Sequence, residues 1–88
     1  MMTLNKAKAL AAEGIARLTG RPIEGVRLVD ALTQCRRSGW IFFYEGALPN
    51  GPVVVTHDGA VHALRAELPL EQTVREFERA QRQQAVTR

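Results

Sequence analysis

The short gaps between the β-prone segments of this sequence constrain its fold more than any other feature. Residues 40–44, 53–56 and 60–64 are rich in aromatic and β-branched side chains. Residues 46–52, with two glycines and two prolines, form a turn-rich loop. The Asp58-Gly59 pair between the last two runs is the strongest short hairpin signal. No gap holds the dozen or more residues that a parallel crossover needs, so the pattern predicts antiparallel pairing.

A further strand is predicted over residues 25–34, where alternate positions are apolar and neither glycine nor proline interrupts the run after Gly25. One side of this strand carries Val26, Leu28, Asp30 and Leu32. A polar turn over residues 36–39 follows. We therefore expect residues 25–34 to form an antiparallel hairpin with residues 40–44.

Both ends of the chain show helical periodicity. Thr3 is a suitable N-cap for the first helix, and Gly20 followed by Pro22 ends it. Pro69 is suited to the start of a second helix, on which Glu71 with Arg75 and Glu78 with Arg82 are predicted to pair on the solvated side. The two apolar stripes are Leu4, Ala7, Ala11, Ile15 and Leu18, then Leu70, Val74, Phe77 and Gln81.

These elements predict an α+β fold with the order helix, four-stranded antiparallel sheet, helix, and with both helices packed on one face of the sheet. The 88 residues suffice for one hydrophobic core and leave no room for a second domain. We expect residues 1–83 to form this single domain and residues 84–88 to form a frayed tail.

Composition narrows the class of protein. The single cysteine, Cys35, excludes an internal disulfide. No apolar run is long enough to cross a membrane, and residues 1–12 do not resemble a signal peptide, so we expect a cytoplasmic protein without a membrane partner. The net charge of +3 is scattered, with only Arg36 and Arg37 adjacent among the cations, which makes nucleic-acid binding the less favoured alternative.

The sequence offers one candidate catalytic arrangement and one candidate set of metal ligands, each of three residues. Cys35 with His62 and Asp30 could supply a nucleophile, a base and an orienting carboxylate, and His57, Asp58 and His62 could approach one metal ion if both histidines shared a face. Structural roles for these side chains are favoured, and the common phosphate, zinc and acyl-transfer motifs are absent from the sequence. We therefore predict no catalytic residue, no metal, no cofactor and no enzymatic activity.

The order of signals in the second half resembles a known family. Its residues are Ser38-Gly39-Trp40-Ile41-Phe42-Phe43, Asn50-Gly51-Pro52, the valine strand, Asp58-Gly59 before Val61-His62, Leu64, Leu68-Pro69-Leu70-Glu71 and Phe77-Glu78. This stretch, 38–78, resembles the immunity protein 35 family, or YrhB domain, of bacterial polymorphic toxin systems. The resemblance implies a small α+β protein, encoded beside a toxin of the peptidase-like kind, that neutralises the toxin by covering its active site or an essential surface.

Such a protein needs a preformed contact surface rather than a catalytic set. From turn position and residue type we predict partner contacts at Arg36, Arg37, Tyr44, Asn50, His57, Asp58 and His62. Tyr44 is expected to keep one edge in water. The alternative function is a small chaperone-like or general protein-interaction domain, and an exposed edge strand could also pair two copies into a homodimer.

Overall fold

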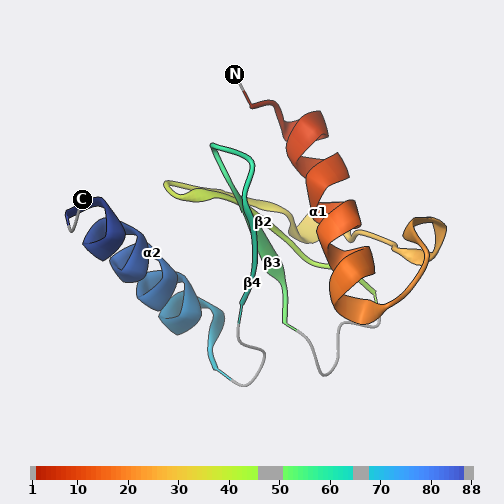
Figure 1. The fold of residues 1–88 in the computed structure, drawn as a ribbon. Helices are drawn as coiled ribbons and strands as arrows, with labels where there is room; N and C mark the ends of the chain where they lie inside the picture. The colour runs from red at the N-terminus through yellow and green to blue at the C-terminus, as the bar shows by residue number, and fades with distance from the viewer. Residues whose placement is uncertain (1, 46–50, 65–67, 87–88) are drawn as a thin grey trace.

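The computed structural model describes residues 2–45, 51–64 and 68–86 and has an α+β architecture (Figure 1). In chain order the elements are α1 (Leu4–Thr19), the 3-10 helices η1 (Ile23–Gly25) and η2 (Asp30–Leu32), β1 (Gln34–Arg36), β2 (Gly39–Phe42), β3 (Val53–Thr56), β4 (Val61–Ala63) and α2 (Leu70–Val86). The strands form one antiparallel sheet in the order β1-β2-β3-β4. The predicted fold class and the hairpin around Asp58-Gly59 are thus confirmed.

Helix α1 begins and ends where its capping residues predict. The Thr3 side-chain oxygen accepts a hydrogen bond from the Lys6 amide at 3.2 Å, which satisfies one free N–H of the first turn. Gly20 adopts the left-handed conformation and its amide donates to the Ala16 carbonyl at 2.9 Å. The buried stripe of the helix consists of small residues and one isoleucine: Ala7, Ala11, Gly14 and Ile15.

The two helices cover opposite faces of the sheet, so the prediction that they share one face is wrong (Figure 1). The core under α1 contains Phe42, Val53 and Val55. The core under α2 contains Ile41 and Val54, with Leu64 and Val74. Because successive side chains of a strand point to opposite faces, the consecutive valines of β3 necessarily divide between the two cores.

The predicted strand over residues 25–34 is also wrong in its extent. Within this segment only Leu28 forms a β-bridge, to Tyr44, which lies just beyond the end of β2. The 3-10 helix η2 then interrupts the pairing, and β1 resumes it with Gln34 opposite Ile41. From Leu28 to Gln34 the first segment advances six residues, whereas its partner advances only three, from Tyr44 to Ile41. The three residues of η2 are therefore looped out of the ladder. Asp30 in this loop pairs with Lys8 of α1, with an N–O distance of 2.7 Å. The turn is shorter than expected, because Arg36 and Gly39 pair across Arg37 and Ser38.

Helix α2 is described through Val86, three residues into the segment expected to be a frayed tail. Its predicted i to i+4 ion pairs do not form in the described part of the chain, where Glu71 pairs with Arg36 of β1 instead. Neither described helix combines the length and apolarity needed to cross a membrane.

Candidate partner-binding surface

Two tight turns lie at the same end of the sheet. Residues 37–38 connect β1 to β2 and residues 57–60 connect β3 to β4, and Gly39 pairs with Thr56 between them. We call these two turns, together with Arg36 at the end of β1, the turn end of the sheet. The antiparallel register therefore brings together four of the predicted contact residues, Arg36, Arg37, His57 and Asp58, although some twenty residues separate the two turns in sequence.

The first turn is tied to α2 by Arg36. Its Nη2 and Nη1 donate to the two carboxylate oxygens of Glu71 at 2.5 and 3.2 Å, while its Nε donates to Gln34 Oε1 at 2.9 Å. The hydrogen bonds that Arg36 donates to Glu71 raise the pKa of Arg36, and they lower the pKa of the Glu71 carboxyl. Arg36 is thus engaged within the molecule, and its neighbour Arg37 is the exposed cation of this turn.

The second turn is closed by Thr56 and Asp58. The Thr56 hydroxyl donates to the Asp58 carboxylate and accepts from the Ala60 amide at 3.1 Å. The Asp58 carboxylate also accepts from that amide at 3.4 Å. The hydroxyl first, and the amide second, lower the pKa of Asp58, so the turn presents a carboxylate held in one orientation.

His57, beside this carboxylate, is exposed and packs against an aromatic side chain of β2. Its ring meets Trp40 edge-on with ring centroids 5.0 Å apart. Trp40 is half-buried at the margin of the core under α1. The two rings give the turn end an apolar contact beside its charges, a pairing that suits a protein interface.

The remaining predicted contact residues lie elsewhere. Tyr44 is buried in the core under α1 with 5% of its surface exposed, so the prediction that one edge of its ring contacts water is wrong. Burial raises the pKa of its hydroxyl. Its hydroxyl has no hydrogen-bond partner in the described part of the chain. His62, in the middle of β4, packs against Phe77 of α2 with ring centroids 5.1 Å apart. Asn50 lies outside the described residues.

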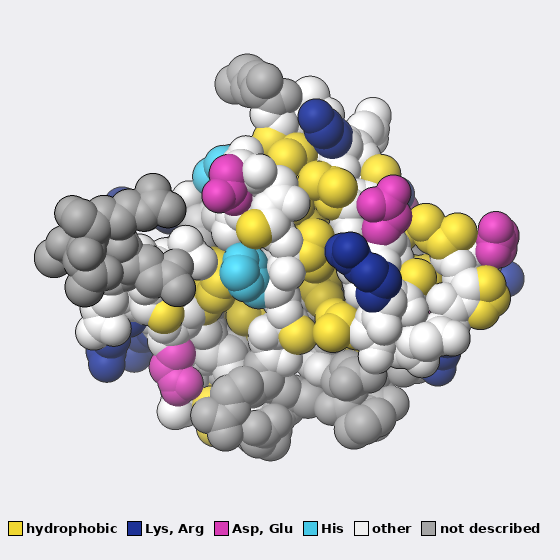
Figure 2. All heavy atoms as spheres, in the orientation of Figure 1, with side chains coloured by type: hydrophobic (Ala, Val, Ile, Leu, Met, Phe, Trp, Pro, Cys, Tyr) yellow, Lys and Arg dark blue, Asp and Glu magenta, His cyan; other side chains and the backbone are white. Residues whose placement is uncertain are grey.

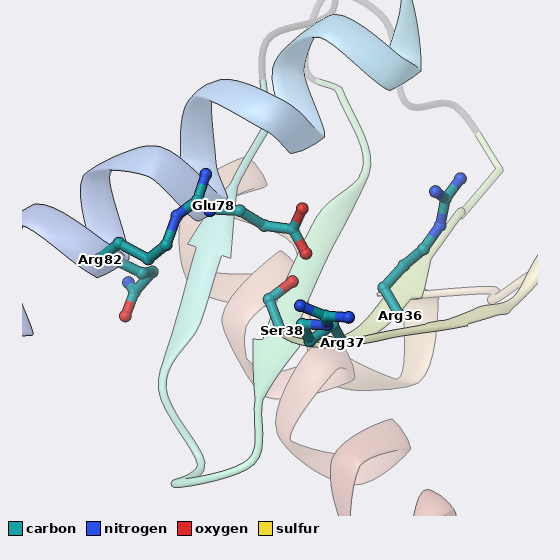
Figure 3. Close-up of a pocket in the computed structure, with 6 residues that line it drawn as sticks. Arg36, Arg37, Ser38, Glu78 and Arg82 are labelled. Atoms are coloured by element: carbon teal, nitrogen blue, oxygen red, sulfur yellow. The ribbon is translucent and has the colours of Figure 1, made fainter.

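A cleft of about 430 Å³ separates the first turn from the C-terminal half of α2 (Figure 3). It is lined by Arg36, Arg37, Ser38, Glu78, Gln81 and Arg82. Sequence reasoning placed Glu78 and Arg82 on a solvated helix face and missed their position opposite the turn. The only available signal was the phase of α2, because Glu71, Glu78 and Arg82 fall on one side of the apolar stripe that ends at Gln81.

A second hollow of about 260 Å³ follows the seam between α1 and β4 and is lined by Gly14, Arg17, Leu18, Val61 and Ala63. Figure 2 shows hydrophobic side chains reaching the surface along this seam. Leu18 there is 51% exposed. The seam offers mainly apolar area, and Arg17 is the one charged residue among those that line it.

The minimal catalytic and metal arrangements are not assembled. Cys35 lies on β1 and His62 on β4, at opposite edges of the sheet, and Asp30 is paired with Lys8. His57 contacts Trp40 near the core under α1, whereas His62 faces α2, so the two histidines do not share a face. Within the described residues no three His, Cys, Asp or Glu side chains are grouped as metal ligands would be.

Comparison with known proteins gives no assignment, since no family model, no curated protein and no solved structure matches the chain.

Proposed function

We propose that this protein binds a partner protein through the turn end and acts as an immunity protein, neutralising a cognate bacterial toxin in the cytoplasm by covering its active site or an essential surface. The observation that carries the proposal is the exposure of Arg37, His57 and Asp58, from two separate turns, at one end of the sheet. The stretch that resembles the immunity protein 35 family, residues 38–78, includes the second turn and the N-terminal half of α2.

The rigidity of this end supports a binding role. The two central strands, β2 and β3, are packed against α1 on one face and against α2 on the other, and Arg36 joins the first turn to α2. Each turn is short and hydrogen-bonded into the sheet, so little conformational entropy would be lost when a partner is bound. A surface of this kind inhibits the toxin by covering part of it and needs no catalytic residues of its own.

The area required sets the extent of the interface. A stable complex buries about 800 Å² on each partner, and the accessible surface of this protein is 5993 Å². The partner therefore covers roughly one eighth of the molecule. The cleft between the first turn and α2 is too small to supply that area alone, so we expect both turns to take part.

The test is co-expression of the chain with the toxin domain encoded beside it, with cell survival and co-purification as the two readouts. We expect rescue together with a stable one-to-one complex, and no rescue from a toxin of an unrelated system. Rescue without a complex would contradict neutralisation by direct binding. Failure of both readouts, with the toxin shown active and this protein shown folded, would overturn the immunity function.

The chaperone-like alternative has a separate measurement. A general chaperone suppresses heat aggregation of unrelated proteins and does so without fixed stoichiometry, whereas an inhibitor with a preformed surface does not. Suppression of aggregation of several unrelated proteins, combined with failure to bind the toxin, would replace the immunity function by the chaperone-like one.

A further inference from the structure

The cleft between the first turn and α2 carries more positive than negative charge. Three of its lining residues are arginines and one is a carboxylate, Glu78. The arginines come from two elements far apart in sequence, Arg36 and Arg37 from the end of β1 and its turn, and Arg82 from α2. Figure 3 shows them around one hollow, with the Glu78 side chain extending from α2 toward the turn.

The three arginines are not equivalent. Arg36 uses its guanidinium for Glu71 and Gln34, so its charge is already matched. Arg37 and Arg82 are exposed and form no ion pair in the described part of the chain. These two guanidinium groups are therefore the ones available to a ligand, each with a planar set of donors suited to a carboxylate.

Two further polar groups of the cleft also lack partners among the described residues. The Ser38 hydroxyl oxygen is buried and has no hydrogen-bond partner among the described residues. The Glu78 side chain forms neither an ion pair nor a hydrogen bond within that same part of the chain. Its charge acts on Arg36 only by through-space attraction, which contributes to the raised pKa of Arg36. In Figure 3 the Ser38 hydroxyl points toward the Glu78 carboxylate. Glu78 therefore contributes a negative charge to the cleft, and this charge repels any anion that enters.

We propose that this cleft binds an acidic segment of the partner protein, with aspartate or glutamate side chains paired to Arg37 and Arg82. The inference rests on the proposed function, because it names the chemistry of the partner that the turn end would recognise. Glu78 sets the selectivity of the cleft, since its charge lowers the affinity for any anion and leaves only a segment that engages both arginines bound tightly.

The same carboxylate argues against a nucleic acid as the occupant. Specific duplex binding uses about six to ten phosphate contacts. The cleft offers two arginines that form no ion pair with any described residue, and Glu78 lies beside them. Phosphates spaced along a regular backbone would meet this carboxylate as well as the arginines, and a peptide can place its carboxylates on either side of it.

The first experiment needs no cognate partner. Hexaglutamate peptide is titrated into the isotope-labelled full chain, and the side-chain guanidinium signals of Arg37 and Arg82 are followed by NMR at low salt. We expect weak, saturable binding with shifts confined to the cleft, reduced at least fivefold by Arg37→Glu and abolished by 0.5 M NaCl. Shifts spread over all arginines, no shift at all, or tighter binding of a DNA duplex of equal charge would overturn the proposal.

The second experiment uses the complex with the toxin domain. Arg37→Glu and Arg82→Glu are each expected to weaken its affinity about tenfold or more, the scale of a charged pair lost at an interface. Glu78→Gln is expected to strengthen binding severalfold, because it removes the competing charge and keeps the side chain's shape. Arg27→Glu is the matched control, since it makes the same change of charge on an exposed arginine whose backbone pairs with Glu45 at the other end of the sheet.

The outcomes separate this proposal from the proposed function. A complex that forms with wild-type affinity in both Arg37→Glu and Arg82→Glu would leave the immunity function standing and overturn the acidic-segment proposal. Equal weakening by Arg27→Glu would also overturn it, because net charge alone would then explain the effect. If no complex forms with the wild-type chain, the immunity function fails, and the hexaglutamate titration alone decides whether the cleft binds carboxylates. Circular dichroism and thermal unfolding of each variant verify that it is folded.

Discussion

Replacing Gly39 with alanine tests the closest backbone approach within the sheet. Gly39 begins β2 with φ +147°, a conformation that L side chains rarely adopt. A Cβ at this position would lie 2.0 Å from the Val55 carbonyl oxygen and 2.9 Å from the Thr56 Cα. Both atoms belong to the backbone of β3, which is hydrogen-bonded along β2, so neither can withdraw without disturbing the ladder.

The magnitude follows from two separate costs. A residue held in a sparsely populated backbone region costs about 1–3 kcal/mol, and forcing extra atoms into a packed interior costs about 1–3 kcal/mol more. We expect Gly39→Ala to lower the free energy of unfolding by about 2–6 kcal/mol. A domain of this length has a total stability of about 4–13 kcal/mol, so the variant is expected to be largely unfolded if the protein lies near the lower limit.

The matched control is Gly20→Ala at the end of α1. Gly20 also has positive φ, +71°, but an added Cβ there has no atom within 4 Å, so only the backbone strain remains, about 1–2 kcal/mol. Urea unfolding of both variants, followed by far-ultraviolet circular dichroism, gives the two free energies by linear extrapolation. A loss in Gly39→Ala no greater than that in Gly20→Ala would refute the close approach of β2 to β3 on which the register of the turn end depends.

Three further predictions concern single features of the fold. Hydrogen bonding lowers the pKa of Asp58, so its carboxylate stabilises the fold above the unfolded-state pKa and stops doing so as the pH falls through the folded-state value. The stability difference between wild type and Asp58→Asn, measured by urea unfolding, should therefore shrink between pH 7 and about pH 3, and a constant difference would contradict the turn geometry. Tyr44→Phe removes a buried hydroxyl that has no partner within the described residues, so its measured stability should equal or exceed that of wild type by up to about 1 kcal/mol; a loss of that size would mean that the hydroxyl is hydrogen-bonded. Amide hydrogen exchange should be faster in α2 than in α1. Among the side chains that the structure describes, Val74 is the one residue of α2 in the buried apolar core, whereas α1 contributes Ala7, Ala11 and Ile15, and equal protection would contradict this difference in packing.

Local signals predicted the parts of the fold that local chemistry determines. The N-cap at Thr3, the left-handed stop at Gly20 and the hairpin around Asp58-Gly59 each depend on a few neighbouring residues, and the structure confirms all three. The turn end follows from the same hairpins, because antiparallel strands joined by short turns place alternate turns at the same end of a sheet. Its gathering of Arg36, Arg37, His57 and Asp58 was thus contained in the predicted topology.

The strand over residues 25–34 failed because periodicity cannot detect an insertion. Val26 and Leu28 do pack against the core under α1, as their alternation predicts. The three residues of η2 then loop out, and Leu32 among them is 51% exposed. The insertion of an odd number of residues reverses which side chains face α1, so Cys35 stands opposite Trp40. Asp30 of the inserted segment forms an ion pair with Lys8 of α1. This contact joins segments that are distant in sequence, so no local pattern predicts it.

The sequence does contain a signal for helices on opposite faces of the sheet, namely strands that are apolar at consecutive positions. A sheet covered on one face needs polar residues at every second position, whereas residues 41–43 and 53–55 are apolar throughout. Continuous apolar runs are typical of strands buried on both faces, and here they divide between α1 and α2. The consequence reaches the candidate site: with α2 on the face opposite α1, its C-terminal half lies across from the first turn, and Arg82 and Glu78 join Arg37 around one cleft. Both helices on one face would have left that turn without the second wall on which the proposed recognition of an acidic segment depends.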